Sequence, residues 1–342
     1  MFGKAIVRGL LAVAMVASCA VVARADVFKM TGGQTSLQFV TVGNPGNAAD
    51  PPTGYGSVAN TYQMGKYDVT VGQYVQFLNA VAKTDTYGLY NSDMATDYQT
   101  IGITQSGSSG SYSYAVSGSY GQAANCPVFD VSWGDAARFS NWLQNGQPTS
   151  GVENAGTTEN GAYTLNGAIS NSALMAVTRN AGATYFIPSE DEWYKAAYYD
   201  PNKPGGAGYW LYPTKSNTAP GNTLPDAGNS ANYFVAEFTD STDYLTPVGE
   251  FSNSPGAYGT FDMGGDICQW NEGNIAGSSR GLRGGSWCDD SYILVSSHRN
   301  DLNPVYGSLG VGFRVASVPE PASLVMVVSG AIAALVWWRR CK

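Results

Sequence analysis

Few residues in this chain of 342 can do acid–base, nucleophilic or metal chemistry. It has one histidine, His298, and five cysteines, of which Cys126, Cys268 and Cys288 lie away from the two ends. Thiolates are nucleophiles and ligands for soft metal ions such as copper(I), whereas one imidazole cannot form a histidine-based metal centre. An odd number of cysteines permits at most one disulfide between them and leaves at least one free thiol.

Three helices that could position such residues are predicted from their N-terminal capping pairs. The pairs are Thr70 with Gln73, Ser132 with Asp135, and Ser189 with Glu192. Apolar residues at helical spacing are predicted to form the buried faces: Tyr74, Phe77, Leu78 and Val81; Ala136, Phe139 and Leu143; Trp193, Ala196 and Ala197. In the third helix, Glu190 and Asp191 complement the positive end of the helix dipole.

Three long stretches between these helices are rich in Gly, Ser, Thr, Asn and Tyr: residues 85–125, 145–182 and 200–230. Loops of this length are usually functional or disordered. They hold more aromatic residues than disordered segments usually do. We therefore expect ordered, irregular surface.

Five motifs follow one another in a fixed order. The first four are Tyr67-Asp68-Val69-Thr70, Pro127-Val128-Phe129-Asp130-Val131-Ser132-Trp133, Ile187-Pro188-Ser189-Glu190-Asp191-Glu192-Trp193 and Gly259-Thr260-Phe261-Asp262-Met263-Gly264-Gly265-Asp266. The fifth opens with Arg283-Gly284-Gly285-Ser286-Trp287 and closes with Gly312-Phe313-Arg314. The series resembles the formylglycine-generating enzyme family, also called the sulfatase-modifying factor domain. The resemblance implies an α+β fold, a variant of the C-type lectin fold with much irregular structure, in which Trp133, Trp193, Trp270 and Trp287 are core rings.

By this resemblance, catalysis would need two cysteines after the Gly-Gly-Ser motif to hold copper(I), which activates oxygen for oxidation of a substrate cysteine. Cys288 stands near the first position, but Ile293-Leu294-Val295 occupies the second, so one thiol is missing. Neither Cys126 nor Cys268 is expected beside Cys288. A related branch, the iron-dependent sulfoxide synthases, relies on several histidines, and this chain has one.

The resemblance also implies structural calcium, which prefers oxygen ligands. The first ligand set would be Asn232, the Tyr233 carbonyl, Asp240 and the Thr242 carbonyl. The second would be Asp262, the carbonyls of Gly265 and Ile267, and Gln269. Gln269 replaces the family's usual glutamate, which should weaken that set, and Asp262 is equally well explained as a turn residue beside glycines.

Both ends of the chain resemble export signals. Residues 1–25 contain Lys4 and Arg8, an apolar run and the sequence Ala-Arg-Ala, as in a secretory signal peptide. Residues 318–342 contain Val318-Pro319-Glu320-Pro321, an apolar run over 322–338 and a basic tail, as in the PEP-CTERM sorting signal of Gram-negative bacteria. That signal would enter the membrane transiently and be cut by an exosortase; a plain membrane anchor is the alternative. Residues 26–317 then form one domain at the cell surface, in the extracellular matrix or in the medium.

The charge of the chain excludes one class of partner. Residues 26–321 hold 12 Lys and Arg against 26 Asp and Glu, a net charge of −14. Such a surface repels phosphate backbones, so no nucleic acid is expected as a partner. Two functions remain: a non-catalytic module that binds extracellular polysaccharide or an exported protein, or a copper-dependent oxidase that converts a cysteine of exported sulfatases to formylglycine.

Overall fold

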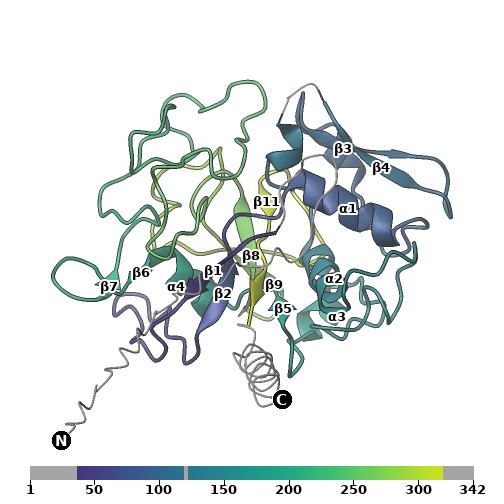
Figure 1. Ribbon diagram of the computed structural model, residues 1–342, viewed down its shortest axis with the longest axis horizontal. Coiled ribbons are helices and arrows are strands. Elements are labelled where there is room, and N and C mark those ends of the chain that lie inside the picture. The colour runs from purple at the N-terminus through teal and green to yellow at the C-terminus, as the bar shows by residue number, and fades with distance from the viewer. Residues whose placement is uncertain (1–36, 119–121, 319–342) are drawn as a thin grey trace, which may run out of the picture.

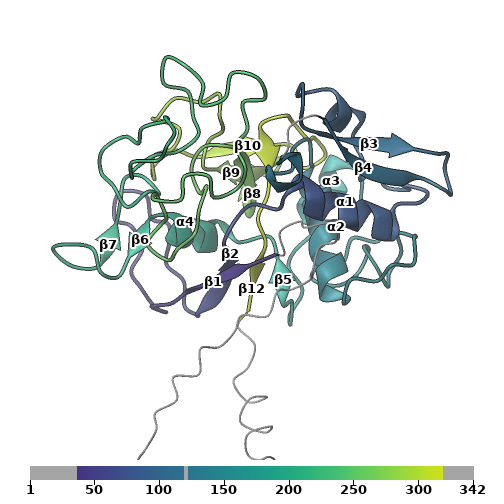
Figure 2. The same ribbon diagram turned by 45° about the horizontal axis from the view of Figure 1, so that its top comes forward.

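Two four-stranded sheets run through the middle of the protein. The computed structural model describes residues 37–118 and 122–318. Helices α1 to α3 and the hairpin of β3 and β4 lie together on one side of the sheets, and the mostly irregular segment between β7 and β8 lies on the other (Figure 1, Figure 2). The chain is thus an α+β domain with much irregular structure, as predicted.

The two sheets are joined by the Gly-Phe-Arg motif. One sheet has the order β1-β2-β12-β5, with antiparallel neighbours: β1 Phe39–Val42, β2 Tyr62–Gly65, β12 Ala316–Ser317 and β5 Tyr185–Phe186. The other has the order β10-β9-β8-β11: β10 Asn300–Leu302, β9 Ser279–Arg283, β8 Cys268–Ile275 and β11 Val311–Gly312. Strand β11 runs parallel to β8. Because Phe313 and Arg314 lie between β11 and β12, both side chains are buried where the sheets meet.

The three predicted helices are confirmed, together with their caps. The helices are α1 Val71–Val81, α2 Trp133–Gln144 and α4 Glu190–Tyr198, each with a reciprocal capping box at its start. The predicted apolar faces are buried. A further short helix, α3 Asn171–Ala176, begins at Ser170, whose side chain accepts from Ala173 N.

The three stretches expected to be irregular contain short regular elements, and the first contains the most: α3 lies in 145–182 and β7 in 200–230. Within residues 85–125 the chain forms a 3-10 helix, Ser92–Ala95, and a hairpin of β3 Gly102–Ser106 with β4 Ser113–Ser117. Asn79 of α1 holds the hairpin, because its side chain accepts from Tyr114 N at 3.0 Å and donates to Tyr114 O at 2.8 Å. A second small pair, β6 Tyr199–Asp200 with β7 Gly208–Tyr209, follows α4.

Among residues 37–118 and 122–318, no helix has the length and apolar character that spanning a bilayer requires. The predicted signal peptide, and the apolar run over 322–338, lie outside the described residues.

Candidate functional site

Four aromatic rings from two distant segments form a partly exposed cluster, here called the aromatic platform: Phe234, Phe238, Tyr244 and Trp287. Trp287 stacks on Tyr244 with ring centroids 4.3 Å apart and an interplanar angle of 12°. Phe238 meets both rings edge-on, at 4.8 Å from Tyr244 and 5.5 Å from Trp287, and is 36% exposed. Half-exposed rings of this kind are typical of surfaces that bind sugars or peptides.

Side-chain hydrogen bonds hold the platform in place. Trp287 Nε1 donates to the Tyr98 hydroxyl at 2.8 Å, and that hydroxyl donates to Leu309 O. Asp243 accepts from both the amide and the hydroxyl of Thr100. The segments around Tyr98 and Tyr244, which are distant in sequence, therefore both contact Trp287.

The sequence did not single out the platform. Trp133, Trp193 and Trp270 are fully buried, as predicted for core rings, but Trp287 is only half-buried. The expectation therefore holds only in part for Trp287, whose ring packs against the main core but also stacks on Tyr244 near the surface. The sequence signal for the platform was the presence of three aromatic residues, Phe234, Phe238 and Tyr244, within a short segment that is mostly polar.

Two thiols lie in one hydrogen-bonded cluster beside the platform. Cys288 is exposed, and its Sγ lies 3.3 Å from Ser286 Oγ. Ser286 Oγ donates to Asp289 Oδ2 at 2.8 Å, and the buried Cys268 thiol donates to the same carboxylate oxygen at 3.9 Å. Cys268 and Cys288 are thus linked only indirectly, through Asp289 and Ser286. Cys126 is buried elsewhere, against the Gln122 carbonyl.

The buried Cys268 thiol resists ionisation. Burial raises the pKa of Cys268 far above its usual range, and the nearby Asp289 carboxylate raises it further. Cys268 is therefore a neutral thiol at neutral pH, and copper(I) prefers thiolates. At the position where the family has its second cysteine, Leu294 is fully buried in a small apolar cluster. These residues fit a two-thiolate copper site poorly.

The residues of the first proposed calcium set already make hydrogen bonds within the protein. Asn232 is buried and its side chain donates to Tyr244 O at 2.8 Å and to Asp266 Oδ1 at 2.9 Å. Tyr233 O accepts from Asn222. The half-exposed Asp240 accepts from the amides of Thr242 and Asp243, which leaves its other carboxylate oxygen for a cation.

The second proposed calcium set fits a cation less well. Gln269 Oε1 already accepts from Trp193 Nε1 and from Arg314 Nε, both at 2.7 Å, so both of its lone pairs are used. Asp262 Oδ2 accepts from Gly249 N at 2.7 Å, and Gly265 O accepts from Ile267 N. The Arg314 guanidinium beside Gln269 is positive and repels a second cation.

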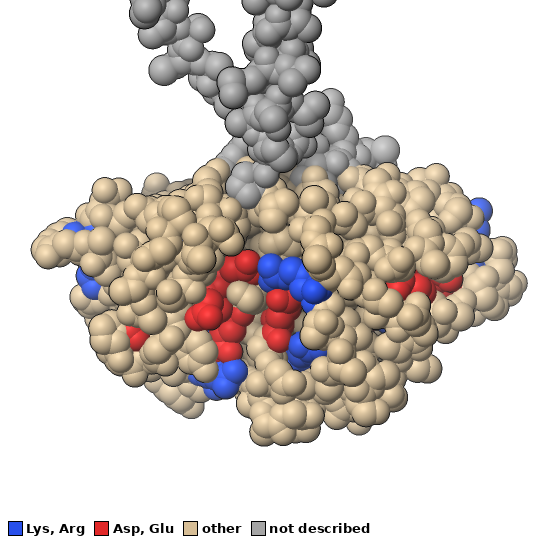
Figure 3. All heavy atoms as spheres, turned by 90° about the horizontal axis from the view of Figure 1, so that it is seen from below, with Lys and Arg blue, Asp and Glu red and all other residues tan. Residues whose placement is uncertain are grey.

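The clustered Arg and Glu side chains form ion pairs with one another. Figure 3 shows acidic and basic residues side by side near the middle of one face. Arg179 bonds both Glu192 and Glu272 at 2.7 Å. Glu190 bonds Arg283 at 2.7 Å and Arg299 at 2.6 Å. These networks bind α4 to the second sheet, and we assign them to the stability of the fold.

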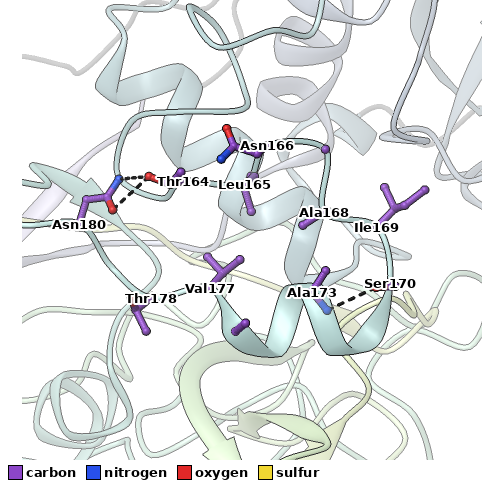
Figure 4. Close-up of a pocket in the computed structure, with 12 residues that line it drawn as sticks. Thr164, Leu165, Asn166, Ala168, Ile169, Ser170, Ala173, Val177, Thr178 and Asn180 are labelled. Carbon is purple, nitrogen blue, oxygen red and sulfur yellow. Dashed lines mark hydrogen bonds between the residues drawn. The ribbon is translucent and has the colours of Figure 1, made fainter.

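A cavity of about 500 Å³ opens beside α3 (Figure 4). None of its twelve lining residues, which run from Thr164 to Asn180, is titratable. Its polar contacts are local, such as the hydrogen bond between Asn180 and Thr164. We therefore take the aromatic platform and the neighbouring thiols, not this cavity, as the candidate functional site.

Comparison with known proteins identifies the family. The chain is 28% identical over 153 residues to hercynine oxygenase of Mycolicibacterium smegmatis, an alignment that covers 38% of this chain and only 32% of that protein. Among solved structures it resembles Treponema denticola variable protein 1, with a TM-score of 0.51, 17% identity, and coverage of 84% of this chain and 97% of that chain. CarF gives a TM-score of 0.47 at 19% identity, covering 83% of this chain and 99% of that one. Residues 20–318 match the sulfatase-modifying factor enzyme 1-like domain, so the chain belongs to this family.

Proposed function

We propose that this chain is a non-catalytic member of the family that binds an extended polysaccharide or peptide across the aromatic platform. The observation that carries the proposal is the stack of Trp287 on Tyr244, edged by the exposed Phe238. Stacked rings offer a rigid apolar surface to a sugar face or a peptide side chain at little cost in conformational entropy. The polar loops around the rings supply hydrogen-bonding groups.

Trp287→Ala is expected to weaken such binding by about tenfold or more, because truncating a central aromatic anchor typically costs 2 kcal/mol or more. The measurement is binding of wild type and variant to arrays of bacterial polysaccharides and peptides, followed by titration of the best binder. Tyr292→Ala is the matched control, since Tyr292 is 63% exposed and its ring pairs with His298 instead of the platform. Equal loss in both variants would contradict the proposal.

A second candidate is the oxidation of a sulfatase cysteine, which the exposed Cys288 and the neighbouring Cys268 favour. We expect no such activity, because Cys268 is held as a neutral thiol and no other sulfur lies in the cluster formed by Ser286, Cys288 and Asp289. The test is the mass of a sulfatase-type cysteine peptide after incubation with the copper-loaded protein and oxygen. An aldehyde product that Cys288→Ser abolishes would establish the oxidase instead.

Calcium belongs to the same proposal, at the first ligand set. A cation that binds only the folded state raises the melting temperature by linkage. Calcium in millimolar excess is therefore expected to raise it by a few degrees relative to chelator, and Asp240→Ala should remove most of that shift. Asp301→Ala, at an exposed aspartate on β10, should leave the shift in place. The same melting temperature with calcium and with chelator would exclude the site.

Export also remains part of the proposal. It rests on the sequence patterns of residues 1–25 and 318–342, and on the acidic composition between them. An exosortase would be the processing partner. The intact mass of the protein recovered from its host tests whether the C-terminal segment is removed. A mass that includes residues 322–342 rules out cleavage by an exosortase.

A further inference from the structure

A buried carboxylate on the helical side of the domain has an oxygen with no partner. Asp130 is 4% exposed, and within residues 37–118 and 122–318 its Oδ2 makes no hydrogen bond. The loop after β10 presses on its backbone: Asp130 N donates to Ser308 O at 3.0 Å, and a Cβ at Gly307 would lie 2.3 Å from Asp130 O. Only glycine at 307 permits this contact. The site is therefore built closely around Asp130.

The surroundings of Asp130 disfavour its charge. Burial, like-charge repulsion from Asp97 and Asp93, and a hydrogen bond with the Asp97 side chain together raise the pKa of Asp130 to about 7. Two neighbouring carboxyl groups in a buried site are stable when they share a proton or meet a cation. Asp130 thus lacks a cationic partner from the described part of the chain.

Asp130 lines a cavity of about 380 Å³ whose other walls suit a cation. Tyr87 and Tyr90 supply aromatic rings, and Asp135 supplies a second carboxyl group. The one basic lining residue, Arg138, is neutralised by Glu159, which accepts from its Nε at 2.7 Å and from its Nη2 at 3.2 Å. The lining is therefore acidic overall.

We propose that this cavity binds a primary alkylammonium group, carried by a free amine or by a lysine side chain. An ammonium group has three N–H donors and a positive charge, which match an unpartnered carboxylate with further acidic groups around it. Its alkyl chain fits against the Tyr90 ring, because the face of the Tyr87 ring already stacks on the Arg138 guanidinium at 4.5 Å. The cavity is much larger than a bare metal ion needs. The inference does not depend on the platform, and its test does not involve Trp287.

The test is calorimetric titration of the protein with Nα-acetyl-lysine methylamide, with 1,5-diaminopentane, and with Nα-acetyl-norleucine methylamide as the uncharged analogue. Wild type is expected to bind both amines and not the norleucine compound, and added sodium chloride should weaken the binding. Asp130→Asn should weaken it about tenfold or more, because a charge-assisted hydrogen bond is replaced by a neutral one. Asn tolerates the positive φ of 56° at this position, so the backbone is retained.

Asp301→Asn is the matched control, because Asp301 is exposed on the edge strand β10. It should bind the amines as wild type does, and the melting temperatures of both variants report whether they are folded. Absence of amine binding in wild type, equal affinity in Asp130→Asn, or displacement of the amine by calcium at equimolar concentration would each overturn the proposal. Binding of diaminopentane without acetyl-lysine methylamide would assign the site to free amines.

Discussion

Arg314→Ala is expected to lower the free energy of unfolding by about 3–5 kcal/mol, the usual cost of breaking a buried ion pair by removing one partner. Arg314 and Asp68 are both fully buried, with Nη2 3.2 Å from Oδ2. The guanidinium also donates to Gln269 Oε1 and to the carbonyls of Gly65, Phe261 and Asp262. Alanine removes a donor from each of these acceptors, although Gln269 Oε1 keeps Trp193 Nε1 and Asp262 O keeps Gln269 Nε2. Thermal unfolding should show a loss on the order of 10 °C for a domain of this size.

The size of that loss should depend on pH. Burial raises the pKa of Asp68 to about 8, above its value near 3.9 in an unfolded chain. Protonation of Asp68 therefore favours the folded state, and this contribution disappears as the pH rises through the folded-state pKa. The Arg314 guanidinium lowers the pKa of Asp68, so without it Asp68 keeps its proton in the folded state to a higher pH. The loss caused by Arg314→Ala should therefore be larger at pH 9.5 than at pH 7.

Two companion variants show whether the ion pair is responsible. Arg314→Lys keeps the charge but loses the planar fork, so it should recover only part of the stability. Arg314→Met combined with Asp68→Asn removes both charges and should be more stable than Arg314→Ala. If Arg314→Ala melts within a degree or two of wild type, the guanidinium does not hold the sheets together.

Glu190→Gln is expected to destabilise the fold by roughly 3 kcal/mol, because one carboxylate serves two arginines. Glu190 Oε1 accepts from Arg283 Nη2 at 2.7 Å and from Arg299 Nε at 2.8 Å, while Oε2 accepts from Arg299 Nη2 at 2.6 Å. The Arg283 side chain is 1% exposed, so its charge would be left buried without a carboxylate partner. Chemical denaturation of wild type and variant measures the difference.

Asp191→Asn is a close control for Glu190→Gln. Both acids lie in the first turn of α4, so both variants lose a similar interaction with the helix dipole, about 0.3–1 kcal/mol. Asp191, however, accepts only from Gly56 N among its described contacts and makes no ion pair there. The difference between the two variants therefore measures the arginine pairs. Equal effects would mean that Glu190 acts through the dipole alone.

The role of Glu190 marks the limit of what the sequence predicts. Its place at the start of a capped helix is set by residues within three positions, and that prediction is confirmed. Its ion pairs reach residues 93 and 109 positions away, and no local pattern indicates them. The same applies to Asp130, whose cavity is formed by segments far apart in the chain. Local signals therefore predict the elements but not the contacts between them.

The hairpin of β3 and β4 was missed for a different reason. Its strands are rich in Ser, Thr and Gly, which resemble loop sequence, and apart from Gly102 only Ile103 and Tyr114 are buried. The contact with Asn79 of α1 determines its structure, so tertiary packing outweighs a weak local preference. Trp287 shows the reverse case, in which a motif typical of a core carries a half-exposed ring.

The platform is attached to the domain without strand pairing, and this determines what a substitution in it can affect. Phe234, Phe238 and Tyr244 lie outside every strand and helix, and the segment that carries them is tied to its neighbours through Asp243 and Thr100 and through the amide of Phe234. No ladder hydrogen bond depends on the identity of the three rings. Substitution of these rings should therefore leave the register of the sheets unchanged, whereas truncation of a fully buried ring such as Trp270 would open a cavity between the elements.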